Sequence, residues 1–208
     1  MDGHRAGAAK VREVLWWCEE AGVEVVSLWL LSVANLRRPS AELAPLIGII
    51  EDLVLRLRTE AHWDVRPIGD FGLLPEHTAR VMMDAALQDP PQPGVMQVNI
   101  AVAYGGREEL VGAVRRSVAE LAARGHSGEE IARALEEGDI ARHLYTSGQP
   151  DPDLVIRTSG EQRLSGFMPW QGFQSELYFS PVLWPDLTHQ NFQEALDSYR
   201  RRTRTRGV

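Results

Sequence analysis

The sequence predicts an α/β protein in which a mainly parallel sheet is flanked by helices. Segments with helical periodicity alternate with short, almost continuously apolar segments along the 208 residues, and this alternation is typical of parallel strands joined by helices. Polar residues gather after the ends of four apolar segments, which places them at the carboxyl edge of the sheet, where α/β proteins bind ligands. The length fits one substantial core, so we expect a single domain over residues 1–208.

The helical segments each show one apolar face. The first face covers residues 11–18 and ends before Gly22. The sequence Ser127-Gly-Glu-Glu130 is a capping box, which predicts the start of a short helix. We expect longer helices over residues 41–61, 75–87, 107–124 and 190–202.

The strands are predicted from apolar runs that lack helical spacing. We expect them over residues 23–31, 65–69, 95–102, 153–158 and 177–180. Pro67 lies inside the second run and removes a backbone donor, so that strand is predicted to lie at an edge or to carry a bulge.

Composition excludes several classes of partner. The formal net charge of -7 argues against nucleic acid, because phosphate-backbone binding needs a broad excess of Lys and Arg. The only cysteine, Cys18, falls in an apolar helical stripe and is interpreted as a core residue, which favours a reducing, cytoplasmic setting. No apolar run approaches the roughly 20 residues of a membrane span, and the N-terminus has no signal-peptide layout, so we expect no transmembrane segment.

The most informative polar cluster follows the strand expected over residues 153–158. Arg157, Arg163 and Ser165 come within nine positions, with Glu161 between them and Glu176 further along. Arginine offers planar, bidentate donors that suit a diphosphate. The two glutamates are candidate ligands for Mg²⁺, which commonly bridges diphosphates.

Two further clusters allow either a functional or a structural interpretation. Ser32, Asn35 and Arg38 leave a strand and enter a loop, where they would either bind a phosphate or form an asparagine-based turn with solvated arginines. The sequence Tyr104-Gly-Gly-Arg107 places bare backbone near a helix start, which attracts anions, although a glycine pair there is also a common structural turn.

These motifs together resemble a known family over essentially the whole chain. They are Met1-Asp2-Gly3-His4, Ser32-x-x-Asn35-x-x-Arg38-Pro39, Tyr104-Gly105-Gly106-Arg107, Asp153-Leu-Val-Ile-Arg157-Thr-x-Gly160-Glu161-x-Arg163-x-Ser165, Trp170-Gln171 and Glu176-Leu-Tyr-Phe179. The chain resembles the cis-prenyltransferases, the undecaprenyl diphosphate synthase family. The resemblance implies a six-stranded sheet, a homodimer, and a prenyltransferase that uses Mg²⁺ to condense an allylic isoprenoid diphosphate with a second C5 diphosphate.

The resemblance also implies roles around the allylic diphosphate. Asp2 would hold Mg²⁺ on that diphosphate, and Gly3, His4 and Arg38 would help to bind it. Glu176 would also help to hold metal.

The remaining matched residues belong to the second substrate and to the reacting carbons. Arg157, Arg163 and Ser165 would hold the second diphosphate. Ser32 and Asn35 would lie between the two substrates, near the carbon being joined and the proton that leaves.

The chain departs from the family pattern at its start. The family has an asparagine, an arginine and roughly a dozen residues where Gly3 here adjoins His4. We therefore expect that a leading strand and a loop between Gly3 and His4 are missing from this chain.

Other departures bear on the reaction. Ala34 stands where the family has a glutamate, and Pro169 replaces an aliphatic residue; both changes resemble the irregular, lavandulyl-type members that join two allylic diphosphates head-to-middle. Gln162 replaces a metal-site histidine, as in some short-chain members. Leu30 matches the position that blocks the product tunnel in Z-farnesyl diphosphate synthases, which predicts a C10 to C15 product.

Three readings of function remain. The leading one is a short-chain cis-prenyltransferase acting on dimethylallyl or geranyl diphosphate, with a slight preference for head-to-middle coupling. The first alternative is a head-to-tail Z-farnesyl-type synthase that uses isopentenyl diphosphate. The second is a non-catalytic partner subunit of a cis-prenyltransferase, whose expected mark is loss of phosphate-binding residues.

Overall fold

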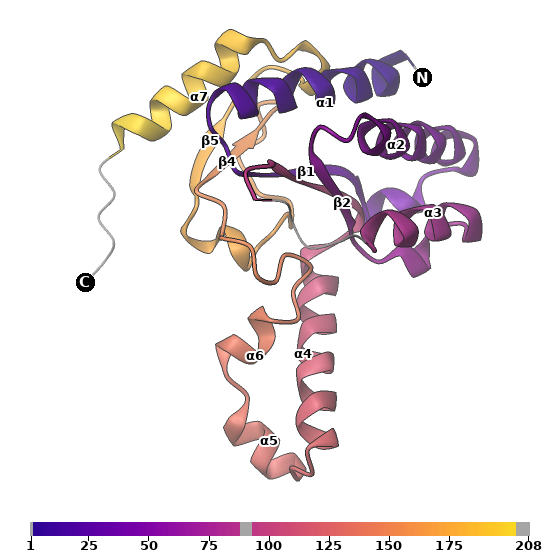
Figure 1. The fold of residues 1–208 in the computed structure, drawn as a ribbon, viewed down its shortest axis with the longest axis vertical. Helices are drawn as coiled ribbons and strands as arrows, with labels where there is room; N and C mark the ends of the chain where they lie inside the picture. The colour runs from indigo at the N-terminus through magenta and orange to yellow at the C-terminus, as the bar shows by residue number, and fades with distance from the viewer. Residues whose placement is uncertain (1, 88–92, 203–208) are drawn as a thin grey trace.

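The structure is a computed structural model that describes residues 2–87 and 93–202, with the Asp2 side chain left out. Helices and strands alternate as expected, and every predicted strand is present within two residues of its predicted ends (Figure 1). The strands are β1 (Val25–Ser32), β2 (Asp64–Ile68), β3 (Gln97–Tyr104), β4 (Leu154–Arg157) and β5 (Glu176–Phe179).

The expectation of one six-stranded sheet is wrong for the described residues. They form a three-stranded parallel sheet in the order β1-β3-β2 and a separate parallel pair, β4-β5. A cavity of about 480 Å³ lies between β1 and β4 and is lined by side chains from both strands. Neighbouring strands pair at about 4.8 Å, so two strands with a cavity between them cannot share a hydrogen-bond ladder. Pro67 lies in β2, which is an edge strand as predicted.

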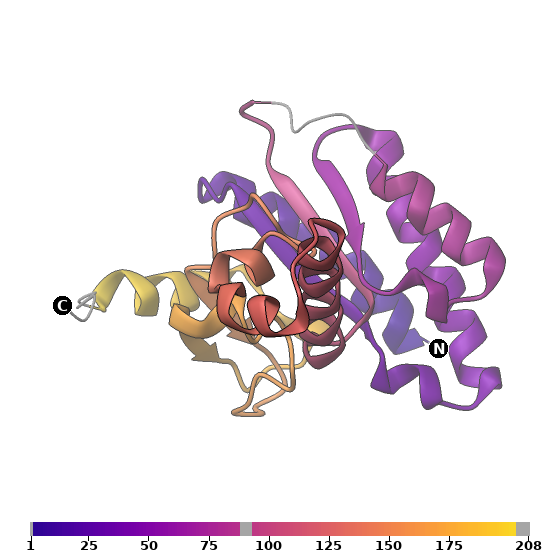
Figure 2. The same cartoon turned by 90° about the horizontal axis from the view of Figure 1, so that it is seen from below.

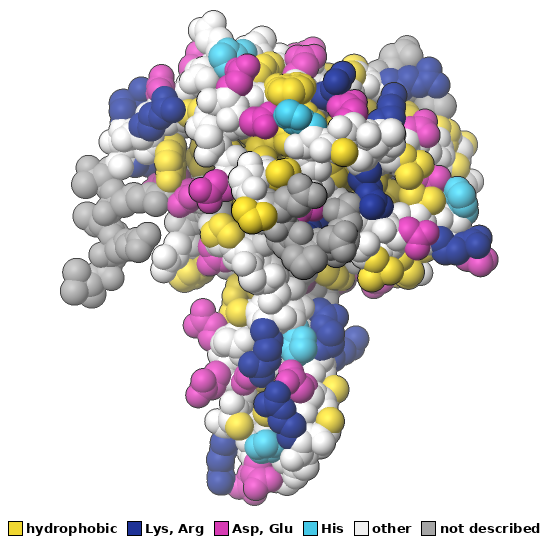
Figure 3. All heavy atoms as spheres, viewed as in Figure 1, with side chains coloured by type: hydrophobic (Ala, Val, Ile, Leu, Met, Phe, Trp, Pro, Cys, Tyr) yellow, Lys and Arg dark blue, Asp and Glu magenta, His cyan; other side chains and the backbone are white. Residues whose placement is uncertain are grey.

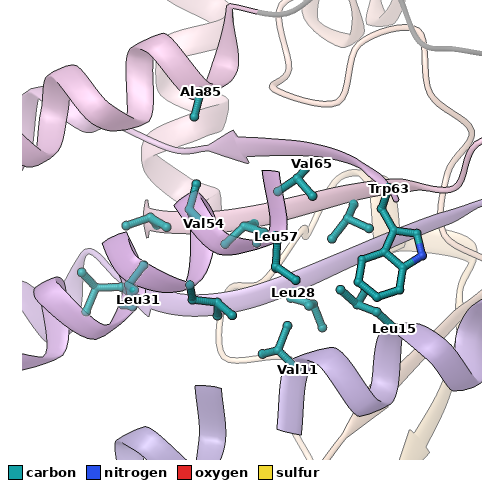
Figure 4. Packing of buried hydrophobic residues seen from close by; sticks show 14 of the residues in the cluster. Val11, Leu15, Leu28, Leu31, Val54, Leu57, Trp63, Val65 and Ala85 are labelled. Carbon is teal, nitrogen blue, oxygen red and sulfur yellow. The ribbon is translucent and has the colours of Figure 1, made fainter. Parts of the chain in front are cut away.

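The main core lies between the three-stranded sheet and the helices that precede β3. These helices are α1 (Asp2–Glu20), α2 (Ser40–Glu60) and α3 (Glu76–Ala86). Leu15 of α1, Leu57 of α2 and Val65 of β2 converge in this core (Figure 4). Burying such side chains contributes about 1.5–3 kcal/mol each, which explains why these helices cover this face of the sheet.

The first and last helices meet on the outside of the molecule. Trp17 of α1 packs against Phe192 of α7 (His189–Arg201), with ring centroids 6.1 Å apart.

Cys18 is buried, as predicted for a core residue, and burial raises the pKa of its thiol to about 12. α1 runs without a break through Gly3 and His4. The expected missing strand and loop stay a prediction.

A helical arm projects from the carboxyl end of β3 (Figure 1). It consists of α4 (Gly106–Ala123), α5 (Gly128–Ala134) and α6 (Glu137–Ala141). The predicted capping box begins α5, since the Ser127 side chain accepts from the Glu130 amide and Glu130 bonds back to Ser127. Seen from below, the arm crosses in front of the sheet, on the side away from α2 and α3 (Figure 2).

Short 3-10 helices complete the fold. They are η1 (Ala34–Arg37), η2 (Phe71–Leu73), η3 (Gln171–Gln174) and η4 (Trp184–Asp186). Within the ranges that the structure covers, none of the helices has the length and hydropathy needed to cross a membrane. A cytoplasmic location stays a prediction.

The start of α4 packs closely against the loop that follows Ser165. The Gly106 amide donates to the Gly166 carbonyl over 3.0 Å. A Cβ atom added at Gly106 would lie 2.2 Å from Cδ of Pro169 and 2.5 Å from the Gly166 oxygen. Only glycine fits there without moving backbone, so the second glycine of the Tyr104-Gly-Gly-Arg motif has a structural reason.

We predict that Gly106→Ala destabilises the protein by about 1–3 kcal/mol, the range for overpacked sites. Urea unfolding measures the change. Gly48→Ala is the matched control: Gly48 lies inside α2 with nothing within 4 Å of an added Cβ, so alanine there should stabilise by about 0.5–1 kcal/mol. Equal midpoints for Gly106→Ala and wild type would contradict this close packing.

Candidate active site

The cavity between the two sheets has an apolar wall and a polar rim. Leu30 of β1 and Ile49, Ile50 and Leu53 of α2 form much of the wall. Its volume of about 480 Å³ lies in the range of roughly 300–1,000 Å³ that is common for small-molecule sites. A ligand with an apolar chain and a polar head would fit such a cavity, with the chain against the wall and the head at the rim.

Arg157 stands at the carboxyl end of β4 and lines the cavity. It is only partly exposed, and its side chain forms no hydrogen bond or ion pair with any described residue. A half-buried guanidinium without a carboxylate partner is costly unless an anion joins it. The binding of an anionic group by Arg157 stays a prediction.

The loop after Arg157 reaches the rim of the same cavity. Leu164 and Phe167 line the cavity, while Arg163 and Ser165 are exposed beside them. Arg163 forms an ion pair with Glu161. Ser165 adopts a left-handed backbone conformation, with φ of 53°, which is strained for a residue other than glycine.

Ser32 and Asn35 brace each other at the end of β1. The Ser32 amide donates to Oδ1 of Asn35 over 3.1 Å, and the Asn35 amide donates to Oγ of Ser32 over 3.0 Å. This reciprocal pair is the asparagine-based turn that the sequence offered as the structural alternative. Arg38, just beyond it, is exposed and forms an ion pair with Glu42 over 2.7 Å.

The first turn of α1 closes another side of the cavity. Gly3 and His4 line it together with Gly7. The predicted metal ligand Asp2 immediately precedes them, and its side chain lies outside the described residues. The structure thus brings Gly3, His4, Leu30 and Arg157 to one cavity.

Glu176 does not join this group. It lies opposite Leu154 at the start of the β4-β5 pair, whereas Arg157 is at the end of β4, roughly 10 Å further along at 3.3 Å per residue. Its carboxylate forms an ion pair with Arg202. A monomer therefore keeps the Glu176 and Arg157 side chains apart.

The described side chains do not by themselves form a metal cage. No group of three or more His, Cys, Asp or Glu side chains able to hold an ion occurs among the residues described. Mg²⁺ is often held by one or two carboxylates together with substrate phosphates. The donors present here would need that contribution from a diphosphate.

The sequence analysis missed a buried polar cluster behind the rim. Glu109, in α4, is 2% exposed and accepts hydrogen bonds from Oη of Tyr104, the Tyr145 amide and Nε2 of Gln171. Gln171 also donates to Oγ1 of Thr146 over 3.1 Å. The sequence carries no prediction for Glu109, because a glutamate in a helix has the same local pattern whether it faces solvent or is buried.

Trp29, which precedes Leu30 in β1, is a further residue of the cavity wall. Its ring stacks on Phe167, with centroids 5.2 Å apart and planes 11° apart. The buried indole Nε1 has no hydrogen-bond partner among the described residues. Trp29 also lines the cavity, so its position affects the shape of the wall.

Comparison with known proteins gives consistent matches over the chain. The family model described as "Putative undecaprenyl diphosphate synthase" matches residues 1–207. A (2Z,6E)-farnesyl diphosphate synthase of Thermobifida fusca is 54% identical over 206 residues, which are 99% of this chain and 80% of that protein. A (2Z,6E)-farnesyl diphosphate synthase of Mycobacterium tuberculosis (strain H37Rv) is 49% identical over 206 residues, covering 99% of this chain and 78% of that protein.

Two solved structures share the fold. The lavandulyl diphosphate synthase of Lavandula x intermedia, in complex with dimethylallyl diphosphate, has a TM-score of 0.85 and 33% identity, and the match covers 98% of this chain and 87% of that one. A probable undecaprenyl diphosphate synthase from Campylobacter jejuni has a TM-score of 0.78 and 25% identity, covering 96% and 91%.

Proposed function

Because the chain belongs to the undecaprenyl diphosphate synthase family, and is therefore a prenyltransferase, we propose that it condenses geranyl diphosphate with isopentenyl diphosphate into a C15 prenyl diphosphate. The single observation that carries this proposal is the half-buried Arg157, without a recorded partner, at the rim of an apolar cavity. The (2Z,6E)-farnesyl diphosphate synthases at 49% and 54% identity support the short product and the head-to-tail reaction.

The reaction needs charge stabilisation more than a nucleophilic side chain. The C1–O bond of the allylic diphosphate breaks, and the diphosphate leaves with the bonding electrons. The alkene electrons of isopentenyl diphosphate form the new bond from its terminal carbon, C4, to C1 of the allylic substrate, which leaves a positive charge on C3. The methylene C2, next to C3, then loses a proton to a diphosphate oxygen, and the C–H electrons form the new double bond. Cationic donors stabilise the departing charge, and a dry apolar wall shelters the allylic cation.

The proposed roles follow the positions of the residues. Arg157, Arg163 and Ser165 hold the second diphosphate, because they stand at the end of β4 and on the loop beyond it. His4 and Gly3, in the first turn of α1, are on the cavity wall and suit the allylic diphosphate.

The other proposed roles rest on the family resemblance. Asp2 and Glu176 are proposed to contribute to Mg²⁺ binding, and Arg38 to the allylic diphosphate. Ser32 and Asn35 shape the turn beside the reacting carbons, since their side chains are engaged with each other.

A second candidate reaction is head-to-middle coupling of two dimethylallyl diphosphates. Ala34 and Pro169 favour it, as does the likeness to the lavandulyl diphosphate synthase structure. That likeness, at 33% identity, is more distant than the two farnesyl diphosphate synthases. The preference for head-to-middle coupling that the sequence suggested is therefore replaced by head-to-tail coupling. No observation on the described residues favours a non-catalytic subunit.

We predict that the protein with Mg²⁺, geranyl diphosphate and isopentenyl diphosphate yields a linear C15 product, identified by chromatography after dephosphorylation. Arg157→Ala should lower kcat/KM roughly 10- to 100-fold, because a charge-assisted hydrogen bond is worth about 1.5–3 kcal/mol. Arg56→Ala is the control, since Arg56 is exposed on α2 and, among the described residues, donates only to the Asp52 carbonyl. A branched lavandulyl skeleton from dimethylallyl diphosphate alone would establish the second candidate instead.

Leu30 is placed to limit the length of the product. It lies in β1, lines the cavity and faces the apolar side chains of α2 that form the opposite wall. Replacing Leu30 by alanine would remove the part of its side chain beyond Cβ from the cavity wall and so enlarge the apolar space.

We predict that Leu30→Ala shifts the product towards longer prenyl chains, read by mass spectrometry. Val26→Ala is the matched control, since Val26 lies on the same strand and the same face but does not line the cavity. A product distribution unchanged in Leu30→Ala would refute the role of Leu30.

A homodimer is proposed from the family and from exposed apolar side chains near the arm. Val111 and Val118, two turns apart on α4, are 50% and 37% exposed. Phe173 of η3 is 85% exposed. Side chains of both charges are spread over the arm on the face seen in Figure 3, with few hydrophobic ones among them. Large exposed apolar side chains with a polar surround are typical of protein interfaces.

We predict that Phe173→Asp weakens the dimer about 30-fold, as expected for a residue worth about 2 kcal/mol at an interface. Light scattering across a dilution series measures the dissociation constant. Leu73→Asp is the control, because Leu73 is also exposed, at 49%, but lies in η2. A monomeric wild type, or equal constants for both variants, would contradict this interface.

A further inference from the structure

Glu109 is a carboxylate buried without a cation. It is 2% exposed, and no ion pair with a lysine, arginine or histidine is recorded for it in the part of the chain that the structure describes. Its oxygens accept instead from Oη of Tyr104 at 2.5 Å, from the Tyr145 amide at 2.8 Å and from Nε2 of Gln171 at 3.2 Å. Directed donors of this kind are what stabilise a buried carboxylate.

Tyr104 connects Glu109 to the segment that contains Met168. Its hydroxyl donates to Glu109 and accepts from the Met168 amide over 3.2 Å. Burial, followed by the neighbouring Glu109 carboxylate, raises the pKa of Tyr104, so the hydroxyl keeps its proton at neutral pH. Because that proton points to Glu109, the oxygen lone pairs are left to face Met168.

The same segment is attached to α4 at two more points. The Gly106 amide donates to the Gly166 carbonyl over 3.0 Å, and Gln171 bridges Glu109 and Thr146. Residues 166–171 are therefore fixed against the start of α4 by hydrogen bonds at their beginning, middle and end. Ser165 directly precedes this segment, so its position follows from these attachments.

A buried carboxylate adds little to the free energy of unfolding. Its desolvation costs several kcal/mol before its hydrogen bonds form, and an apolar side chain of similar volume often stabilises as well or better. What Glu109 adds is direction, since its two oxygens orient a hydroxyl, an amide and a side-chain amide from three separate segments.

We propose that Glu109 is a positioning residue for the second substrate: through Tyr104 and Gln171 it holds residues 166–171 against α4 and so sets where Arg163 and Ser165 meet the second diphosphate. The identity of that ligand rests on the proposed function. Glu109 itself lies behind the rim and does not line the cavity.

The first test compares Glu109→Gln with wild type and with Glu108→Gln, a control for the exposed neighbouring carboxylate. A buried donor or acceptor left unpaired costs about 1–3 kcal/mol, so amide hydrogen exchange in residues 160–171 should accelerate about tenfold or more in Glu109→Gln. Exchange in α2 should stay as in wild type. The KM for isopentenyl diphosphate should rise about tenfold while the KM for the allylic substrate changes less than twofold.

The second test uses Tyr104→Phe, which leaves the carboxylate in place; measured by itself, it should raise the KM for isopentenyl diphosphate even if Glu109→Gln does not fold. Where both variants fold, they are combined in a double-mutant cycle. If Glu109 acts through Tyr104, the two effects on the KM for isopentenyl diphosphate should not multiply, because each substitution breaks the same connection. Multiplying effects, or equal changes in both KM values, would overturn the proposal.

The two readouts separate this proposal from the proposed function. A wild type without turnover would sink the proposed reaction but would leave the hydrogen-exchange comparison intact. An active wild type whose residues 160–171 exchange equally fast in both Glu109→Gln and Glu108→Gln would sink the positioning role alone.

Discussion

The molecule depends on a joint between two parallel sheets that share no hydrogen bond in the described part of the chain. Two kinds of contact connect the start of α4 to the segment before β5. Hydrogen bonds of the Glu109 carboxylate link it to residues 168–171, and Gly106 packs closely against Pro169. On the opposite flank, the indole of Trp184 donates to the Gly7 carbonyl over 2.8 Å and attaches the β4-β5 region to α1. The cavity exists because these connections hold the sheets together while leaving space between β1 and β4.

This arrangement divides the site between the two sheets. The apolar wall comes from β1 and α2, which belong to the main core, and the cationic rim comes from β4 and its loop. Sites positioned on packed elements keep their geometry better than sites carried by free loops. Arg163 and Ser165 lie exposed on the loop after β4, and the proposed role of the buried Glu109 cluster is to fix the segment that follows them.

The structural alternatives proved correct for two motifs. Ser32 and Asn35 satisfy each other, and Gly106 serves close packing. Neither observation removes these residues from the site, because a turn that is fixed internally presents its neighbours in a defined position. It does change what a substitution there would mean: lost activity would reflect a shifted turn as well as a lost contact.

The sequence by itself determined the alternation of helices and strands, the core role of Cys18 and the cluster around Arg157, and it restricted Pro67 to an edge strand or a bulge. Each depends on local periodicity, on backbone chemistry or on residue type, which a sequence displays directly. Only the tertiary structure decided that the strands form two sheets, that Glu176 pairs with Arg202 away from Arg157, and that Glu109 is buried. These facts depend on which distant segments meet, and a glutamate in a helix has the same local pattern whether it meets water or three buried donors.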